Sequence, residues 1–145
     1  MIPQFENLTA AERDLLYQAP ALLSFWEACA QNNVNPVQKE DAIKLAHLKT
    51  FTAVPLLLPY YAEVEKRFTN QWEALEQEYL PLDETRRNKF LQQKQKVEKV
   101  IEKLDARYAQ VLKESLQRFA KHVKRANHSV FQDFLFAFAI DGLNA

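Results

Sequence analysis

The sequence contains very little glycine and cysteine. Its 145 residues include one glycine, Gly142, and one cysteine, Cys29. Loops that bind the phosphate groups of nucleotides need several glycines, so the glycine content excludes both the P-loop and the dinucleotide fingerprint. A single cysteine excludes an internal disulfide and any zinc site built from paired thiolates.

Long apolar runs are also lacking. The longest uncharged stretch, residues 50–62, has thirteen residues and two prolines, whereas a membrane-spanning helix needs about 20 apolar residues. The N-terminus, from Met1 to Glu6, has no basic start and no apolar run of signal-peptide length. We therefore expect a protein that has no membrane partner and is cytoplasmic, where cysteines stay reduced.

The composition is that of a folded globular domain. Apolar residues make up 48% of the chain, and 19 basic side chains balance 19 acidic ones. Proline, asparagine and aspartate must supply the turns, and the long intervals between them favour helices. The sequence predicts one all-α domain over residues 1–145, a bundle of about six helices.

Capping patterns mark the first helices. Thr9 and Glu12 have the spacing of a capping box, which opens a helix that we expect to stop before Pro20. Pro20 suits the first turn of a second helix, because its missing amide needs no partner there. Asn35 before Pro36 predicts the cap of a third helix, which extends to about residue 49.

The second half of the chain predicts a long antiparallel helical hairpin. Residues 60–79 form an acidic helix, and nothing breaks a helix from residue 83 to about 125. A helix of that length would extend about 60 Å, so we expect a bend or break in it. Ser129 predicts the cap of a last short helix. Apolar residues at alternating steps of four and three form the predicted seam: Val97, Ile101, Leu104, Tyr108 and Val111.

Charge is distributed unevenly along the chain. Residues 51–82 have a net charge of −3 and residues 83–128 a net charge of +7. One interpretation is that the acidic helix 60–79 packs antiparallel against the basic start of the next helix. The other is a surface that binds a polyanion or nucleic acid. Its candidate residues are Lys113, Arg118, Lys121, Lys124 and Arg125.

No residue pattern predicts catalysis or a bound cofactor. Cys29 falls in a buried apolar stripe, and His47 lies between apolar neighbours, which is typical of a structural histidine. No histidine pair has metalloprotease spacing. Five carboxylates from three helices could meet near residues 32–35 and hold a hard cation, but they lack EF-hand spacing, so we assign no metal ligand. They are Glu12, Asp14, Glu27, Glu40 and Asp41.

The first part of the chain resembles the TerB-like tellurite-resistance family. The resemblance covers roughly residues 8–50 and rests on residues 8–16 (LTAAERDLL), 19–23 (APALL) and 39–42 (KEDA). It implies an all-helical, bacterial, cytoplasmic protein that is linked to stress resistance and has no established catalytic activity. Where that family has an acidic loop proposed to bind a divalent metal, this chain has amides, which lack the charge that holds a dication: Gln31, Asn32, Asn35 and Gln38.

The C-terminal segment, about residues 129–145, is rich in aromatic side chains. It is either clamped into the core of the domain or presents an apolar surface to a second subunit. Its candidate partner-binding residues are Phe131, Phe134, Phe136, Phe138 and Ile140. We therefore expect a non-enzymatic helical scaffold or protein-interaction domain that binds a protein partner or forms a homodimer. Polyanion binding is the alternative.

Overall fold

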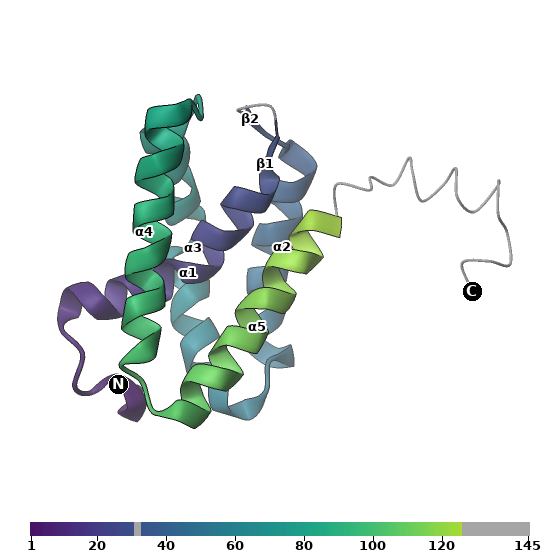
Figure 1. The fold of residues 1–145 in the computed structure, drawn as a ribbon. Coiled ribbons are helices and arrows are strands. Elements are labelled where there is room, and N and C mark those ends of the chain that lie inside the picture. Colours follow the sequence, from purple (N-terminus) through teal and green to yellow (C-terminus); the bar gives the residue numbers. More distant parts are fainter. Residues whose placement is uncertain (31–32, 126–145) are drawn as a thin grey trace, which may run out of the picture.

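The computed structural model describes residues 1–30 and 33–125, which form an all-helical bundle (Figure 1). Within these residues, no helix has both the length and the apolar character that crossing a bilayer requires. Two short 3₁₀ turns, Pro3–Phe5 and Pro55–Leu57, and an antiparallel pair of two-residue strands, β1 and β2, accompany the helices. The helices and strands are α1 (Ala10–Ala28), β1 (Cys29–Ala30), β2 (Asn33–Val34), α2 (Pro36–Thr52), α3 (Leu58–Tyr79), α4 (Glu84–Glu102) and α5 (Ala106–Arg125).

The predicted caps of α1 and α2 are confirmed. The Thr9 side chain accepts a hydrogen bond from the Glu12 amide at 3.1 Å, and the Glu12 carboxylate accepts one from the Thr9 amide at 2.9 Å. The Asn35 side chain accepts hydrogen bonds from the amides of Val37 and Gln38. These bonds satisfy amides that have no partner inside a helix.

The predicted helix break at Pro20 is wrong. Pro20 lies buried inside α1, which continues to Ala28. A proline in a helix leaves the carbonyl four residues earlier without its amide donor. Here the hydroxyl of Tyr60, on α3, donates to the Leu16 carbonyl at 2.5 Å. The donor that Pro20 cannot supply therefore comes from a neighbouring helix.

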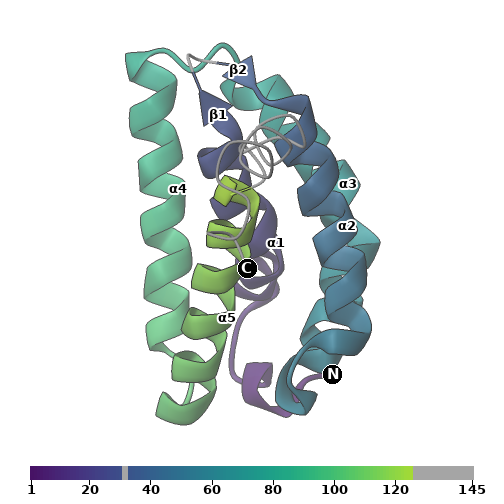
Figure 2. The ribbon, with the colours of Figure 1, turned by 90° about the vertical axis from the view of Figure 1, so that its right-hand side faces the viewer.

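Helix α1 lies at the centre of the bundle. Figure 2 shows α4 and α5 on one side of α1, with α2 and α3 on the other. Four of its residues with small side chains are completely buried, and small side chains let neighbouring helices approach closely. They are Ala19, Ala21, Ser24 and Ala28.

Aromatic side chains fill the interior on both sides of α1. The Phe25 ring on α1 lies 5.5 Å from the Trp72 ring on α3 and 5.7 Å from the Phe90 ring on α4. Toward the other end, Phe5 contacts the ring of Tyr108 on α5 edge-on at 5.5 Å. Such offset and edge-on pairs add to the stability that burial of the rings provides.

The predicted long helix from residue 83 to 125 is broken into α4 and α5, as its length required. Asp105 caps α5, since its carboxylate accepts a hydrogen bond from the Tyr108 amide at 3.0 Å. The described residues therefore contain five α-helices rather than the six predicted. The sixth, after Ser129, lies outside them.

The long antiparallel hairpin is not confirmed. Helices α3 and α4 contact each other much less than each contacts α1. Acidic residues of α3 pair with α2 instead. Lys39 approaches Glu76 at 2.5 Å, and His47 approaches Glu65 at the same distance. The neighbour of the acidic helix is therefore α2.

A candidate protein-binding groove between α4 and α5

The surface between α4 and α5 contains a groove of about 560 Å³, with part of α1 at its base. Figure 1 shows the cause: α4 and α5 meet at the turn that joins them and diverge toward their far ends, and α1 crosses behind. Two residues of this turn stabilise it: the Asp105 carboxylate caps the start of α5, and the Leu104 side chain is buried in the core. Helices that start from such a turn and diverge expose the helix beneath them.

The base of the groove is apolar. Leu23 and Trp26 of α1 are half-buried, and the Trp26 ring stacks on Phe90 with a centroid distance of 5.3 Å. Apolar side chains of α4 and α5 complete the base: Val97, Ile101, Leu116 and Ala120. Most of the polar residues on its rim are charged. A groove with an apolar base and a charged rim suits an amphipathic helix, whose apolar face enters the groove.

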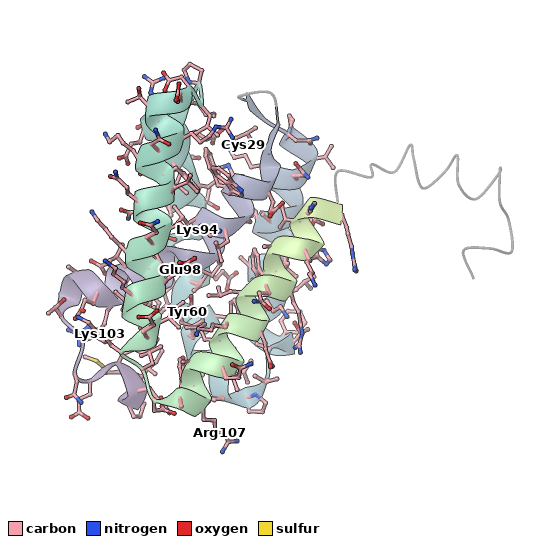
Figure 3. All side chains as sticks on the ribbon, viewed as in Figure 1. Cys29, Tyr60, Lys94, Glu98, Lys103 and Arg107 are labelled. Atoms are coloured by element: carbon pink, nitrogen blue, oxygen red, sulfur yellow. The ribbon has the colours of Figure 1, made fainter. Side chains whose placement is uncertain are left out.

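The charges on the rim differ between its two ends. Lys94 on α4 lines the open end together with Lys121 and Lys124 on α5, and Glu27 of α1 is the acidic residue there. Glu98 lies one turn further toward the narrow end. Figure 3 shows Lys94 and Glu98 on the side of α4 that faces α5. The open end therefore favours acidic groups, whereas the narrow end mixes both signs through Glu98, Glu102 and Lys113.

The five residues predicted to bind anions do not form one surface. Lys113, Lys121 and Lys124 line the groove, whereas Arg118 and Arg125 do not. Arg118 lies toward α2, where burial and the proximity of this guanidinium lower the pKa of Lys49. The residue that sequence reasoning missed is Lys94, which comes from another helix. No spacing along the chain relates it to Lys121.

The predicted partner-binding residues, Phe131, Phe134, Phe136, Phe138 and Ile140, lie outside the described residues. The five carboxylates are not brought together. Glu12 pairs with Lys103, Asp14 with Arg67, and Asp41 with His122 at 3.2 Å. Throughout the part of the chain that the structure describes, no three histidine, cysteine, aspartate or glutamate side chains are grouped to hold a metal ion.

Two further predictions need correction. Cys29 lies just beyond α1 in β1 and is half-buried, and burial raises the pKa of its thiol to about 12. His47 is exposed rather than structural in the core, and its ring contacts Phe51 edge-on. The His47 prediction used neighbours in sequence, and an apolar neighbour on a helix lies about 100° away around the axis. The Cys29 prediction extended the apolar stripe of α1 past Ala28, where the helix ends.

A second hollow, of about 670 Å³, lies between the N-terminus and the start of α3. Three of its charged side chains pair with one another: Arg67 lies 2.9 Å from Asp14 and 3.7 Å from Glu63, and above the Tyr17 ring. The Arg13 guanidinium donates to the Phe5 carbonyl at 3.5 Å. Because these charges are already paired, the hollow offers a charged ligand less than the α4–α5 groove does.

No protein-family model matches this chain, and neither the curated proteins nor the solved structures contain a match to it.

Proposed function

We propose that this chain is a non-enzymatic, cytoplasmic, TerB-like helical scaffold that binds a helical segment of a protein partner in the α4–α5 groove. The observation that carries the proposal is the apolar base between two diverging helices, where Leu23, Trp26 and Ala120 are half-buried. Burying an apolar stripe of a partner helix there removes both surfaces from water. The TerB-like relationship and a link to stress resistance rest on the resemblance of residues 8–50.

The rim supports a partner of defined charge. Lys94, Lys121 and Lys124 line the open end, so a helix with acidic residues beside its apolar stripe has complementary charge. Such complementarity speeds association and selects against basic helices more than it adds affinity. We therefore propose an acidic amphipathic helix as the partner segment.

The proposal is tested by titrating the full chain with a labelled synthetic peptide that has a leucine and phenylalanine stripe flanked by glutamates, followed by fluorescence anisotropy. K94E/K124E reverses two rim charges and is expected to weaken binding about tenfold, equivalent to about 1.4 kcal/mol. The matched control is K89E/K96E, which makes the same charge change on α4. Both of its lysines are exposed and outside the groove. Equal effects of the two variants would overturn the proposal.

The alternative proposal is binding of a polyanion or nucleic acid through the basic end of α5. The lysines at the open end favour it, whereas Glu98 and Glu102 on the facing rim oppose it. It predicts that K121E/K124E weakens binding to a random DNA duplex without loss of helicity, and that salt weakens binding steeply. Duplex binding that is insensitive to salt would contradict this alternative.

A further inference from the structure

The open end of the groove is also where the described part of α5 ends, at Arg125. Residues 126–145 follow it in the sequence and include two acidic and no lysine or arginine side chains. We propose that residues 129–141 occupy the α4–α5 groove of their own chain as a helix antiparallel to α5. This inference rests on the proposed function, because it names an occupant of the same groove.

The sequence of this segment matches an apolar base. Phe131, Phe134, Leu135 and Phe138 follow the i, i+3, i+4, i+7 pattern and form one face of a helix. Phe136 falls off that face. Antiparallel helices need a connection of only a few residues, and residues 126–128 supply it before the Ser129 cap.

The charges support one register of the two helices. When the chain reverses at residues 126–128, each residue forward along the new helix lies opposite one residue back along α5. Asp133 then lies opposite Lys121, and Asp141 lies opposite Lys113. Both acidic residues of the segment therefore meet lysines that line the groove.

The apolar residues agree with the same register. Phe134 lies opposite Ala120 and Phe138 opposite Leu116, and both of these α5 residues line the base of the groove. A helix over residues 129–141 extends about 20 Å, compared with about 30 Å for the 20 residues of α5. The segment thus extends from the open end of the groove as far as Lys113, where the narrow end begins.

Occupancy of the groove by this segment would regulate partner binding. A partner helix must displace residues 129–141, so its apparent affinity falls by the fraction of chains whose groove is free. Weakening the segment's own contacts is therefore expected to tighten binding of the synthetic acidic peptide.

The first test is acrylamide quenching of tryptophan fluorescence in the full chain. Trp26 lines the groove, whereas Trp72 is completely buried and contributes a constant background. F134E/F138E is expected to raise the quenching constant, because the segment leaves the groove. The matched control F136E, with its substitution off the apolar face, is expected to leave quenching unchanged. No difference between F134E/F138E and the wild type overturns the inference.

A charge-reversal pair provides a second test that leaves the apolar core intact. K121E and D133K are each expected to raise Trp26 quenching, and the double variant K121E/D133K is expected to restore protection. Additive effects of the two changes would contradict the register. Sedimentation and Trp26 quenching across the same range of concentrations complete the test. If the protein forms a dimer and Trp26 loses its protection on dilution, the segment in the groove belongs to a second copy, which contradicts the inference.

The inference and the proposed function fail in different ways. A synthetic peptide that binds neither the wild type nor F134E/F138E overturns the partner-binding function, even where quenching shows the segment in the groove. A peptide that binds both equally, with Trp26 equally quenched in both, overturns the inference and leaves the function standing.

Discussion

The hydrogen bond between Tyr60 and Leu16 provides the sharpest test of how α1 tolerates its proline. The Tyr60 hydroxyl donates to the Leu16 carbonyl at 2.5 Å, and both groups are buried. Y60F keeps the ring and its aromatic contacts but leaves that carbonyl without a donor. We expect the free energy of unfolding to fall by about 1–3 kcal/mol, the usual effect of an unsatisfied buried polar group.

Because Tyr60 supplies the donor that Pro20 lacks, we expect the effects of substituting these two residues to be coupled. In a P20A background, the amide at position 20 can donate to Leu16, so the Tyr60 hydroxyl is no longer its only available donor. Y60F should then destabilise the protein less than it does in the wild type. The difference between the two effects, which is the coupling free energy, is expected to be about 1–2 kcal/mol. The P20A change itself removes the unfavourable ring from the helix interior but also removes buried contacts.

The coupling is measured by urea unfolding of the four members of the double-mutant cycle, followed by tryptophan fluorescence. Tyr61 supplies the control, because its hydroxyl is buried beside Tyr60 but pairs with Ser115 at 2.6 Å. Y61F should be additive with P20A. Equal destabilisation by Y60F in both backgrounds would refute the view that α3 supplies the donor that Pro20 lacks.

Three further predictions concern single groups. Burial raises the pKa of Tyr61 from 10.0 to about 12, so folding favours its neutral form; the stability that this gives is complete below pH 10 and falls by about 2 kcal/mol by pH 12, measurable as the difference between wild type and Y61F in urea unfolding along that range. At neutral pH, a thiol pKa of about 12 rather than 9.0 should slow the reaction of Cys29 with a disulfide reagent about 30- to 60-fold relative to the unfolded chain, because the higher nucleophilicity of its thiolate offsets part of the loss of thiolate; absorbance follows the reaction. N35A removes the cap of α2 and should lower the free energy of unfolding by about 1 kcal/mol, again by urea unfolding, whereas no effect would mean that the cap is redundant.

The helix starts could be predicted because their signals are local. A capping box at Thr9 or an asparagine before Pro36 involves residues within one turn of each other. Asp105 carried the same kind of signal, three residues before Tyr108, and it gives the position of the break that helix length alone could not locate.

The path of α1 through Pro20 could not be predicted in this way. Its compensating donor, Tyr60, lies forty residues further along the chain and on another helix. The rule that proline ends a helix is therefore overridden by tertiary structure, which leaves no trace in the sequence around Pro20.

The set of residues that lines the groove could not be predicted from local sequence signals either. The lysines of α5 were identified from their density along one helix, but Lys94 and the half-buried ring of Trp26 join them only because α4 and α5 diverge over α1. Arg118, which sequence density grouped with the lysines, faces α2. A run of like charges predicts that a helix is basic, and helix packing decides which of its charges lie together.

The central position of α1 determines how the molecule opens. Because α1 packs against all four other helices, we expect the amides of its buried part, from Leu16 to Ala28, to exchange with solvent only when the whole bundle unfolds. Helix α4 packs mainly against α1 and touches α3 and α5 only slightly. We therefore expect α4 to detach as one cooperative unit at a lower free energy than global unfolding, so that amides on the α4 wall of the groove exchange before those in the middle of α1.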